Sequence, residues 1–351
     1  MNILVTGATG YIGPFLIKKL KEIGHNVTIL VRKKEDFIRL EAQGFKCILG
    51  DITDKESLVG IFNNIQILFH LANIASWWLP NNQTYYDVNL KGSINLFEEA
   101  KKYPLNKIIH VSSIAAIRQP EGIMADEESI HQGDFESHYS KSKYLVEKET
   151  EKYLKDGLPI VTLNPGVVTG PKDTKTFGKT VLGIANGKVK AKFFPNSYIP
   201  LVYIDDLINI MIKSIDLKVG SKYVVVGENI KIGDVFDKVC KITNRDKITK
   251  ITPNFILLMV AYYSEFLSFF NKKRPSLPID GLKAIKIGAQ ASSKKSINDL
   301  DMEYLNGDQI LTKLIDWFNK NNLINNLSHL STKLKKTNLT YFFYLFKFGF
   351  L

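Results

Sequence analysis

The stretch NILVTGATGYIG, residues 2–13, decides the fold of this chain. It begins with the apolar run NILVT and continues directly into three glycines, Gly7, Gly10 and Gly13. A short apolar run predicts a buried strand, and a glycine-rich turn behind it that opens an amphipathic segment predicts a strand–turn–helix unit. The N-terminus of such a helix, together with the backbone N–H groups of the turn, forms a binding site for phosphate.

Each glycine of this turn has a separate physical role. Gly7 allows the tight turn, Gly10 lets the backbone approach a pyrophosphate, and Gly13 permits close packing of the helix on the strand. Because the loop stands at a strand–helix junction, its GxxGxxG spacing predicts a dinucleotide site. The neighbouring residues predicted to contact the same ligand are Thr9, Tyr11 and Ile12.

Short apolar runs alternate with amphipathic segments through the first half of the chain. The predicted strands are 2–6, 26–31, 46–50, 65–72, 107–113 and 159–166, and the predicted helices are 12–23, 34–43, 55–63, 83–102 and about 136–155. Apolar strands that alternate with helices are typical of a parallel sheet covered on both faces. The sequence therefore predicts an α/β fold with a doubly wound parallel sheet of the Rossmann type.

The alternation breaks up after Pro171. Residues 172–200 are rich in Gly, Lys and Pro and predict a loop-and-helix excursion, after which 199–215 reads as a strand into a helix and 222–228 as a strand. We therefore expect two lobes and a tail. They are a dinucleotide-binding Rossmann domain over 1–171 with a returning segment at about 201–227, a smaller C-terminal substrate lobe over 172–200 and 228–325, and a basic, aromatic tail over 326–351.

Composition and charge narrow the classes of protein. The 351 residues are 45% hydrophobic and 23% charged, which excludes a disordered, collagen-like or coiled-coil chain. The net charge of +12 raises nucleic acid, an acidic membrane surface and anionic small molecules as partners. No basic stripe with interleaved aromatics and no nucleic-acid motif is found, so nucleic acid is not expected. Residues 245–351 carry 16 basic and 8 acidic side chains, and a solvated surface is the simplest explanation.

Two late segments are strongly apolar. Residues 255–270, FILLMVAYYSEFLSFF, precede Lys272, Lys273 and Arg274. The run is shorter than the roughly 20 residues that a spanning helix needs, and Glu265 interrupts it. It predicts a helix packed on the smaller lobe, with a helix lying in a membrane interface as the alternative. The tail 331–351 is either a contact for a partner or lipid or a docked or frayed terminus. Peripheral membrane contact through 255–274 or 331–351 therefore stays open.

The two cysteines, Cys47 and Cys240, show no Cys or His spacing typical of zinc, and no metal site is predicted. The opening MNILVTG lacks the basic stretch and cleavage site of a signal peptide, so we expect a cytoplasmic protein, with membrane association open.

The end of the second predicted strand indicates the cofactor. An NAD site places Asp or Glu there to bind the ribose 2′-hydroxyl, whereas this chain has Arg32 and Lys33. A guanidinium suits a 2′-phosphate, so we predict NADP(H), with NAD as the second choice and a solvated basic turn as the alternative explanation. Other residues expected along the cofactor are Asp51 and Ile52 at the adenine and Leu71 and Ala72 at the end of the fourth strand.

A Ser/Tyr/Lys set predicts the chemistry. Tyr139 and Lys143 are four apart on a predicted helix and share a face, and Ser112 and Ser113 end a strand upstream. Reduction of a carbonyl needs a proton for the developing alkoxide, and a tyrosine can give it when a lysine ammonium lowers its pKa. The serine hydroxyl orients the carbonyl oxygen.

These motifs resemble a known family. TGATGYIG, GDITD, HLAN, NLKGSINLFEEA, VSS, YSKSK, NPGVVTGP and PLVYIDDL follow the order of extended short-chain dehydrogenases/reductases, the NAD-dependent epimerase/dehydratase superfamily. ASWWLPNNQTYYDVN and ADEESIHQGDF are similar to the branch of dihydroflavonol 4-reductases and 3β-hydroxysteroid dehydrogenases. The resemblance implies that Tyr139 is the acid/base, that Lys143 is its partner and that Ser113 orients the substrate, with Ser112 as the fallback. It further implies nicotinamide contacts for Pro165, Gly166 and Val168 and a structural role for Asp206. Asn89 also resembles a family position, but we expect it to make buried structural hydrogen bonds.

Departures from the family pattern favour one reaction. Sugar-nucleotide epimerases usually carry an acid where Val31 stands and many carry Arg where Asn164 stands, and dehydratases carry an Asp-Glu pair where Ile114 and Ala115 stand. We therefore expect an NADPH-dependent oxidoreductase that reduces a ketone or aldehyde, or oxidises the corresponding alcohol. A nucleotide-sugar epimerase with bound NAD is the alternative, and a non-enzymatic NADPH-binding protein ranks third.

The expected partner is a small-molecule carbonyl or alcohol, and a homodimer stays open. The substrate pocket is expected among 74–86, 114–135 and 172–200. Within it, Trp77 and Trp78 suggest an apolar or ring-shaped ligand, or else pack under a loop.

Overall fold

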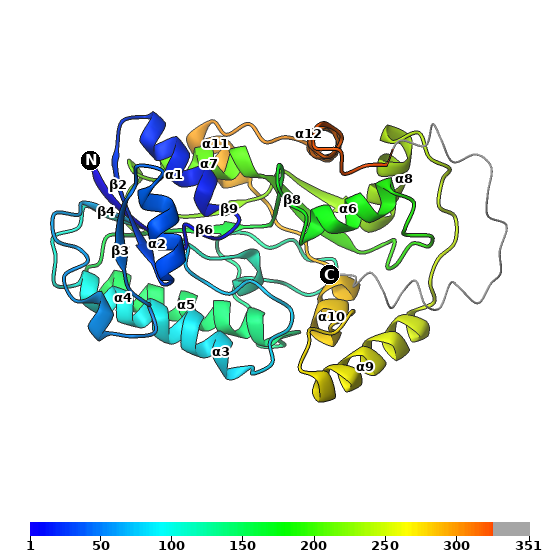
Figure 1. Ribbon diagram of the computed structural model, residues 1–351, viewed down its shortest axis with the longest axis horizontal. Helices are drawn as coiled ribbons and strands as arrows, with labels where there is room; N and C mark the ends of the chain where they lie inside the picture. Colours follow the sequence, from blue (N-terminus) through cyan, green and yellow to red (C-terminus); the bar gives the residue numbers. More distant parts are fainter. Residues whose placement is uncertain (326–351) are drawn as a thin grey trace.

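A seven-stranded parallel sheet forms the centre of the chain, seen in a computed structural model that describes residues 1–325 (Figure 1). Its strands, in spatial order, are β3 (Lys46–Leu49), β2 (Asn26–Val31), β1 (Asn2–Thr6), β4 (Ile67–His70), β5 (Lys107–Val111), β6 (Ile160–Pro165) and β9 (Lys222–Val225). All neighbouring strands are parallel. The strand order reverses between β1 and β4, and this switch point is where doubly wound sheets bind ligands. The predicted Rossmann-type sheet is confirmed.

Helices cover both faces of the sheet, as the continuous apolar strands require. α1 (Gly13–Glu22) packs against α7 (Ile204–Lys213) on one face, and α4 (Gly92–Ala100) packs against α5 (His138–Lys155) on the other (Figure 1). α2 (Lys34–Glu41) connects β2 to β3, and α11 (Lys294–Leu300) packs beside β9.

Two predicted helices differ from the structure. The prediction over 55–63 is wrong, because only a 3₁₀ turn forms at Glu56–Leu58. Val59 is already extended, and Gly60 and Asn64 have positive φ angles of 82° and 60°, which end regular helix. The region 83–102 is helical, but α3 (Gln83–Tyr85) leads through a π-helical turn at Tyr86–Lys91 into α4.

A smaller sheet lies beside the main one. It contains β10 (Glu228–Lys231), β8 (Tyr198–Tyr203) and β7 (Val167–Thr169), in that order. The predicted return of the chain at 199–228 is thus divided, because β8 joins this smaller sheet and only β9 joins the main sheet. The other helices here are α6 (Phe177–Ala185), α8 (Ile232–Ile242), α9 (Asn254–Asn271), α10 (Ile279–Ile287) and α12 (Gly307–Lys320).

One apolar core joins the two parts of the molecule. It extends from Ile3 in β1 and Leu16 in α1 to Val235 in α8 and Leu311 in α12, all fully or almost fully buried. The proposed division into a cofactor domain and a substrate lobe stays a prediction, and the tail 326–351 lies outside the described residues.

Candidate active site

The glycine loop lies between β1 and α1 at the carboxyl edge of the sheet. Gly7 has a φ of +73°, and a Cβ there would lie 2.6 Å from the backbone N of Ala72, at the end of β4. A Cβ on Gly13 would lie 2.4 Å from the Cα of Ala8. Both distances are shorter than any van der Waals contact, so the backbone geometry itself requires glycine at these two positions.

The start of α1 can receive a phosphate. Thr9 and Gly10 are exposed, and no side chain among the described residues caps the helix at Ile12. The N–H groups of a helix's first turn lack partners inside the helix, so they suit an anion. Tyr11 donates from its hydroxyl to the Pro171 carbonyl at 3.2 Å, which ties the loop to the segment that follows β7 of the smaller sheet. These features fit a dinucleotide pyrophosphate.

The residues predicted for the adenosine end lie side by side. Arg32 follows β2, Asp51 follows β3, and Nε of Arg32 lies 3.8 Å from Oδ2 of Asp51. The other carboxylate oxygen of Asp51 accepts hydrogen bonds from the N–H and hydroxyl of Thr53, both at 2.9 Å. Ile52 is buried and packs against Gly92, where a Cβ would clash with it at 2.7 Å.

The end of β4 is held close to the glycine loop. The backbone N–H groups of Leu71 and Ala72 donate to the carbonyl and the hydroxyl of Thr6, at 3.3 and 3.2 Å. His70 lies between the hydroxyls of Thr6 and Ser93, each 2.9 Å from one ring nitrogen. His70 is therefore a packed, hydrogen-bonded histidine.

Tyr139 and Lys143 stand on successive turns of α5. Ser137 caps this helix by accepting a hydrogen bond from the N–H of Ser140 at 3.1 Å, which fixes where its first turn begins. Ser113, just beyond the carboxyl end of β5, lies close enough to the Tyr139 hydroxyl to oppose a rise in its pKa. Lys143 is only 1% exposed, and its ammonium donates to the Val111 carbonyl at 3.3 Å. The structure therefore brings the three predicted catalytic side chains together.

Burial controls the titration of these groups. It raises the pKa of Tyr139, while the nearby Ser113 hydroxyl opposes the rise. Burial lowers the pKa of Lys143 to about 8, and the negative charge of Glu147 opposes that fall. The direction for Tyr139 is the opposite of the predicted lowering by Lys143, because desolvation disfavours a buried phenolate.

Trp77 contacts the tyrosine directly. Its ring packs edge-to-face on the Tyr139 ring, with centroids 5.6 Å apart at 85°. Of the two tryptophans suggested for the substrate pocket, this one therefore lies at the Ser/Tyr/Lys set.

Ser112 faces away from this set. Its hydroxyl donates to Oε2 of Glu147 at 2.7 Å, inside the core between β5 and α5. The same oxygen accepts from Asn164 at 2.8 Å, and Oε1 pairs with Lys222 on β9 at 2.5 Å. Asn164, at an epimerase's arginine position, is thus fully buried and bonded inward. Ser113, not its neighbour, is the serine beside Tyr139.

Glu147 was not predicted from the sequence, although a signal was present. It follows Lys143 by four residues, as Lys143 follows Tyr139, so the three side chains share one face of α5. An acid four residues after the lysine, on the buried face of the same helix, indicates a negative charge that acts on the lysine.

A second buried pair was also missed. Arg118 and Glu136 lie 2.7 Å apart, with side chains 9% and 2% exposed. Glu136 stands three residues before Tyr139, and its charge adds to the rise in the tyrosine pKa. The two residues are far apart in the sequence and follow no motif, so nothing in the pattern pointed to them.

The predicted nicotinamide residues follow β6. Pro165 ends the strand, and Gly166 approaches β8 so closely that a Cβ would lie 2.3 Å from the Pro200 carbonyl oxygen. Val168 lies in β7 and is half-buried.

The two residues expected to be structural are confirmed as such. Asn89 accepts from the N–H of Ile74 at 2.7 Å and donates to Ser142 at 2.9 Å, and Asp206 accepts from the N–H of Leu305 at 3.0 Å.

Comparison with known proteins identifies the family. A family model described as the NAD dependent epimerase/dehydratase family matches residues 3–227. The chain belongs to this family. The resemblance to extended short-chain dehydrogenases/reductases that the motifs indicated is thereby confirmed.

Two relatives match about nine-tenths of the length of this chain. A Methylococcus capsulatus protein named sterol demethylase protein B is 24% identical over 330 residues, which are 92% of this chain and 100% of that protein. A Synechocystis protein provisionally named as a dihydroflavonol 4-reductase is 27% identical over 325 residues, or 90% and 93% of the two chains. Among solved structures, that of gox2253 is 29% identical with a TM-score of 0.75 and covers 92% of this chain and 99% of its own.

Proposed function

We propose that this chain is an NADPH-dependent reductase of a ketone or aldehyde, which in reverse oxidises the corresponding secondary or primary alcohol. The observation that carries the proposal is the placement of Ser113 beside the Tyr139 hydroxyl, with the buried Lys143 one helical turn away on α5. The name of the Synechocystis relative supports the same reaction class.

The side chains have separate roles in this reaction. Ser113 donates to the carbonyl oxygen and fixes its position, and Tyr139 holds a proton at its phenol oxygen and gives it to that oxygen as the alcohol forms. The raised pKa of Tyr139 keeps this proton in place at neutral pH. Lys143 places a positive charge beneath the site, favours transfer of the tyrosine proton and helps to hold the nicotinamide ribose. NADPH, when bound, supplies the hydride.

The residues proposed to hold the cofactor follow the carboxyl edge of the sheet. The glycine loop and the start of α1 bind the pyrophosphate, and Arg32 binds a 2′-phosphate. The complete proposed set is Gly7, Thr9, Gly10, Tyr11, Ile12, Gly13, Arg32, Asp51, Ile52, Leu71, Ala72, Tyr139, Lys143, Pro165, Gly166 and Val168.

A substrate screen tests the reaction. NADPH oxidation is followed with dihydroflavonols, ketosteroids, small aldehydes and UDP-sugars, and we expect turnover with at least one of the first three groups. Turnover of UDP-sugars alone, by a protein purified with NAD already bound, would instead establish the epimerase, the alternative that the family's description keeps open.

A further inference from the structure

Helix α9 presents an apolar face to the outside of the molecule. Its most exposed side chains are each at least 60% exposed, and they are Phe255, Met259, Tyr262, Phe266, Phe269 and Phe270. Their spacing of four, three, four, three and one residues places all six on one face of the helix. α9 stands at the outer edge of the molecule with α10 beside it (Figure 1).

Three polar residues within α9 bond to the protein. Ser264 donates to the Leu277 carbonyl at 3.1 Å, and Ser268 donates to the Lys273 carbonyl at 2.5 Å. Glu265, the acid that interrupts the apolar run, accepts from the N–H of Ile279 at 2.7 Å. The helix therefore lacks the polar outer face of an ordinary amphipathic surface helix and offers hydrocarbon to its surroundings.

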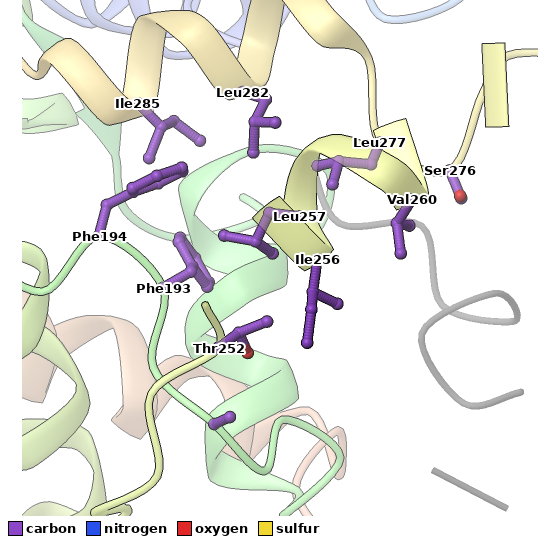
Figure 2. A pocket seen from close by; sticks show the side chains of 11 residues that line it. Phe193, Phe194, Thr252, Ile256, Leu257, Val260, Ser276, Leu277, Leu282 and Ile285 are labelled. Atoms are coloured by element: carbon purple, nitrogen blue, oxygen red, sulfur yellow. The ribbon is translucent and has the colours of Figure 1, made fainter. Parts of the chain in front are cut away.

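The inner side of α9 is already occupied by protein. Leu257 and Val260 close an apolar cavity of about 40 Å³ against Phe194 and against Leu282 and Ile285 of α10 (Figure 2). The outer face is separate from this cavity and is the part of α9 that is left for a partner.

The charges beside this face are positive. α9 ends at Lys272, which adopts a left-handed conformation, and Lys272, Lys273 and Arg274 are all exposed. Lys283 and Lys286 on the neighbouring α10 are exposed as well. Aromatic side chains bordered by lysine and arginine suit the boundary between the acyl chains and the headgroups of an anionic bilayer.

We propose that the outer face of α9 docks on an anionic membrane surface, with Lys272, Lys273 and Arg274 against the headgroups. Within residues 1–325, no helix is long and apolar enough to cross a membrane, so α9 lies in the interface and does not span the bilayer. Its 18 residues give it a length of about 27 Å along the surface.

Docking in this way places the membrane on the side of the molecule where α5, the helix of Tyr139, begins. Residues 272–278 connect the end of α9 directly to α10, so the basic residues lie near the start of α10. Asp280, at the start of α10, lies within electrostatic range of His138, the residue before Tyr139. One consequence rests on the proposed reductase activity. An apolar carbonyl compound can enter the site from the bilayer.

Cosedimentation with lipid vesicles tests the docking. Full-length protein, without cofactor or substrate, is mixed with vesicles of phosphatidylcholine alone or of phosphatidylcholine with phosphatidylglycerol. We expect binding to the anionic vesicles, weakened by salt, and a severalfold loss in the Met259→Asp/Phe266→Asp variant. Ile38→Asp, which replaces an equally exposed apolar residue on α2, is the matched control and should bind as the wild type does.

A second variant guards against a folding defect. Lys272→Glu/Lys273→Glu lies at and beyond the end of α9 and should also release the protein from anionic vesicles while its melting temperature stays unchanged. Vesicle binding retained by both variants would overturn the proposal. A different result would also overturn it: the wild type does not bind vesicles and is a dimer, and the Met259→Asp/Phe266→Asp variant is a monomer. In that case a second copy of the chain covers the face. A protein that binds vesicles but never oxidises NADPH would reject the reductase and keep the docking.

Discussion

The guanidinium of Arg32 lies beside the carboxylate of Asp51, with Nε 3.8 Å from Oδ2. Neighbouring parallel strands, β2 and β3, deliver the two residues to the same edge of the sheet. The Arg32 side chain is 61% exposed, so the ion pair contributes little to stability and the guanidinium is accessible to a ligand. This relationship makes the cofactor preference testable without disturbing the fold.

Arg32→Glu should reverse the preference for the phosphorylated cofactor. A lost charge-assisted contact and a new repulsion should weaken NADPH binding about tenfold to a hundredfold, and NADH binding much less. Titration of both cofactors by fluorescence measures the effect. Arg39→Glu, which alters an exposed arginine paired with Asp36 on α2, is the control. Equal losses for NADPH and NADH would contradict the assignment.

Tyr139→Phe should abolish turnover and keep cofactor binding. Loss of the proton donor is expected to lower kcat by roughly 10²- to 10⁴-fold, while the ring still packs against Trp77. The matched control is Tyr144→Phe, which removes a hydroxyl from the same helix beside Phe135. Turnover by Tyr139→Phe at the wild-type rate would show that another group supplies the proton.

The two adjacent serines should separate activity from stability. Ser113→Ala should lower kcat/KM about tenfold or more, because it removes the hydroxyl beside Tyr139 that is proposed to orient the carbonyl oxygen. Ser112→Ala should instead lower the free energy of unfolding by about 1–3 kcal/mol, because Glu147 loses a buried donor. Urea denaturation and steady-state kinetics on both variants check the contrast, and the opposite pattern would identify Ser112 as the catalytic serine.

The activity should depend on the charge of Lys143. Because its pKa is about 8, the ammonium form is populated below this pH and kcat/KM should fall as the pH rises through it. Glu147→Gln removes a negative charge that favours the ammonium, so the alkaline limb of the profile should move to lower pH. Glu151→Gln, an exposed acid on the same helix that bonds Lys148, should leave the limb in place. An unmoved limb in Glu147→Gln would exclude Glu147 as a positioning residue.

Substitutions of the loop glycines should separate effects on stability from effects on cofactor binding. Gly13→Ala places a Cβ against the backbone of Ala8 and should lower the free energy of unfolding by about 1–3 kcal/mol or more. Gly10→Ala meets only the Gly7 carbonyl oxygen at 3.3 Å and should unfold much like the wild type, yet bind NADPH weakly. Thermal unfolding with and without NADPH compares them. Full cofactor affinity in Gly10→Ala would mean that the pyrophosphate does not approach this residue.

The main sheet could be predicted because its strands carry their signal locally. NILVT and NVTILV are short runs rich in Val, Ile and Leu, and they form β1 and β2 with the predicted ends. The helix predicted over 55–63 is wrong because the apolar residues there have helical spacing, while Gly60 and Asn64 take conformations that end a helix. The pairing of β8 with β7 and β10 depends on distant segments, which no local pattern records.

The site could be predicted where motif and fold coincide. Tyr139 and Lys143 need only helical spacing to share a face, and Ser113 needs only the end of β5. The pKa of Tyr139 could not be predicted, because burial, which raises it, is a property of the folded chain. The pair of Arg118 and Glu136 likewise arises only when separate loops meet.

The ion pair between Glu147 and Lys222 connects the proposed proton-handling site to a distant part of the chain. All three proposed catalytic side chains precede Pro171, but Lys222 lies on β9, which follows the long excursion through the smaller sheet. The buried carboxylate behind Lys143 therefore has a cationic partner that no catalytic motif contains, and a buried charge that loses its partner is costly. A substitution of Lys222 on the edge strand should thus reach the charge of Lys143 through Glu147, although it touches no catalytic residue.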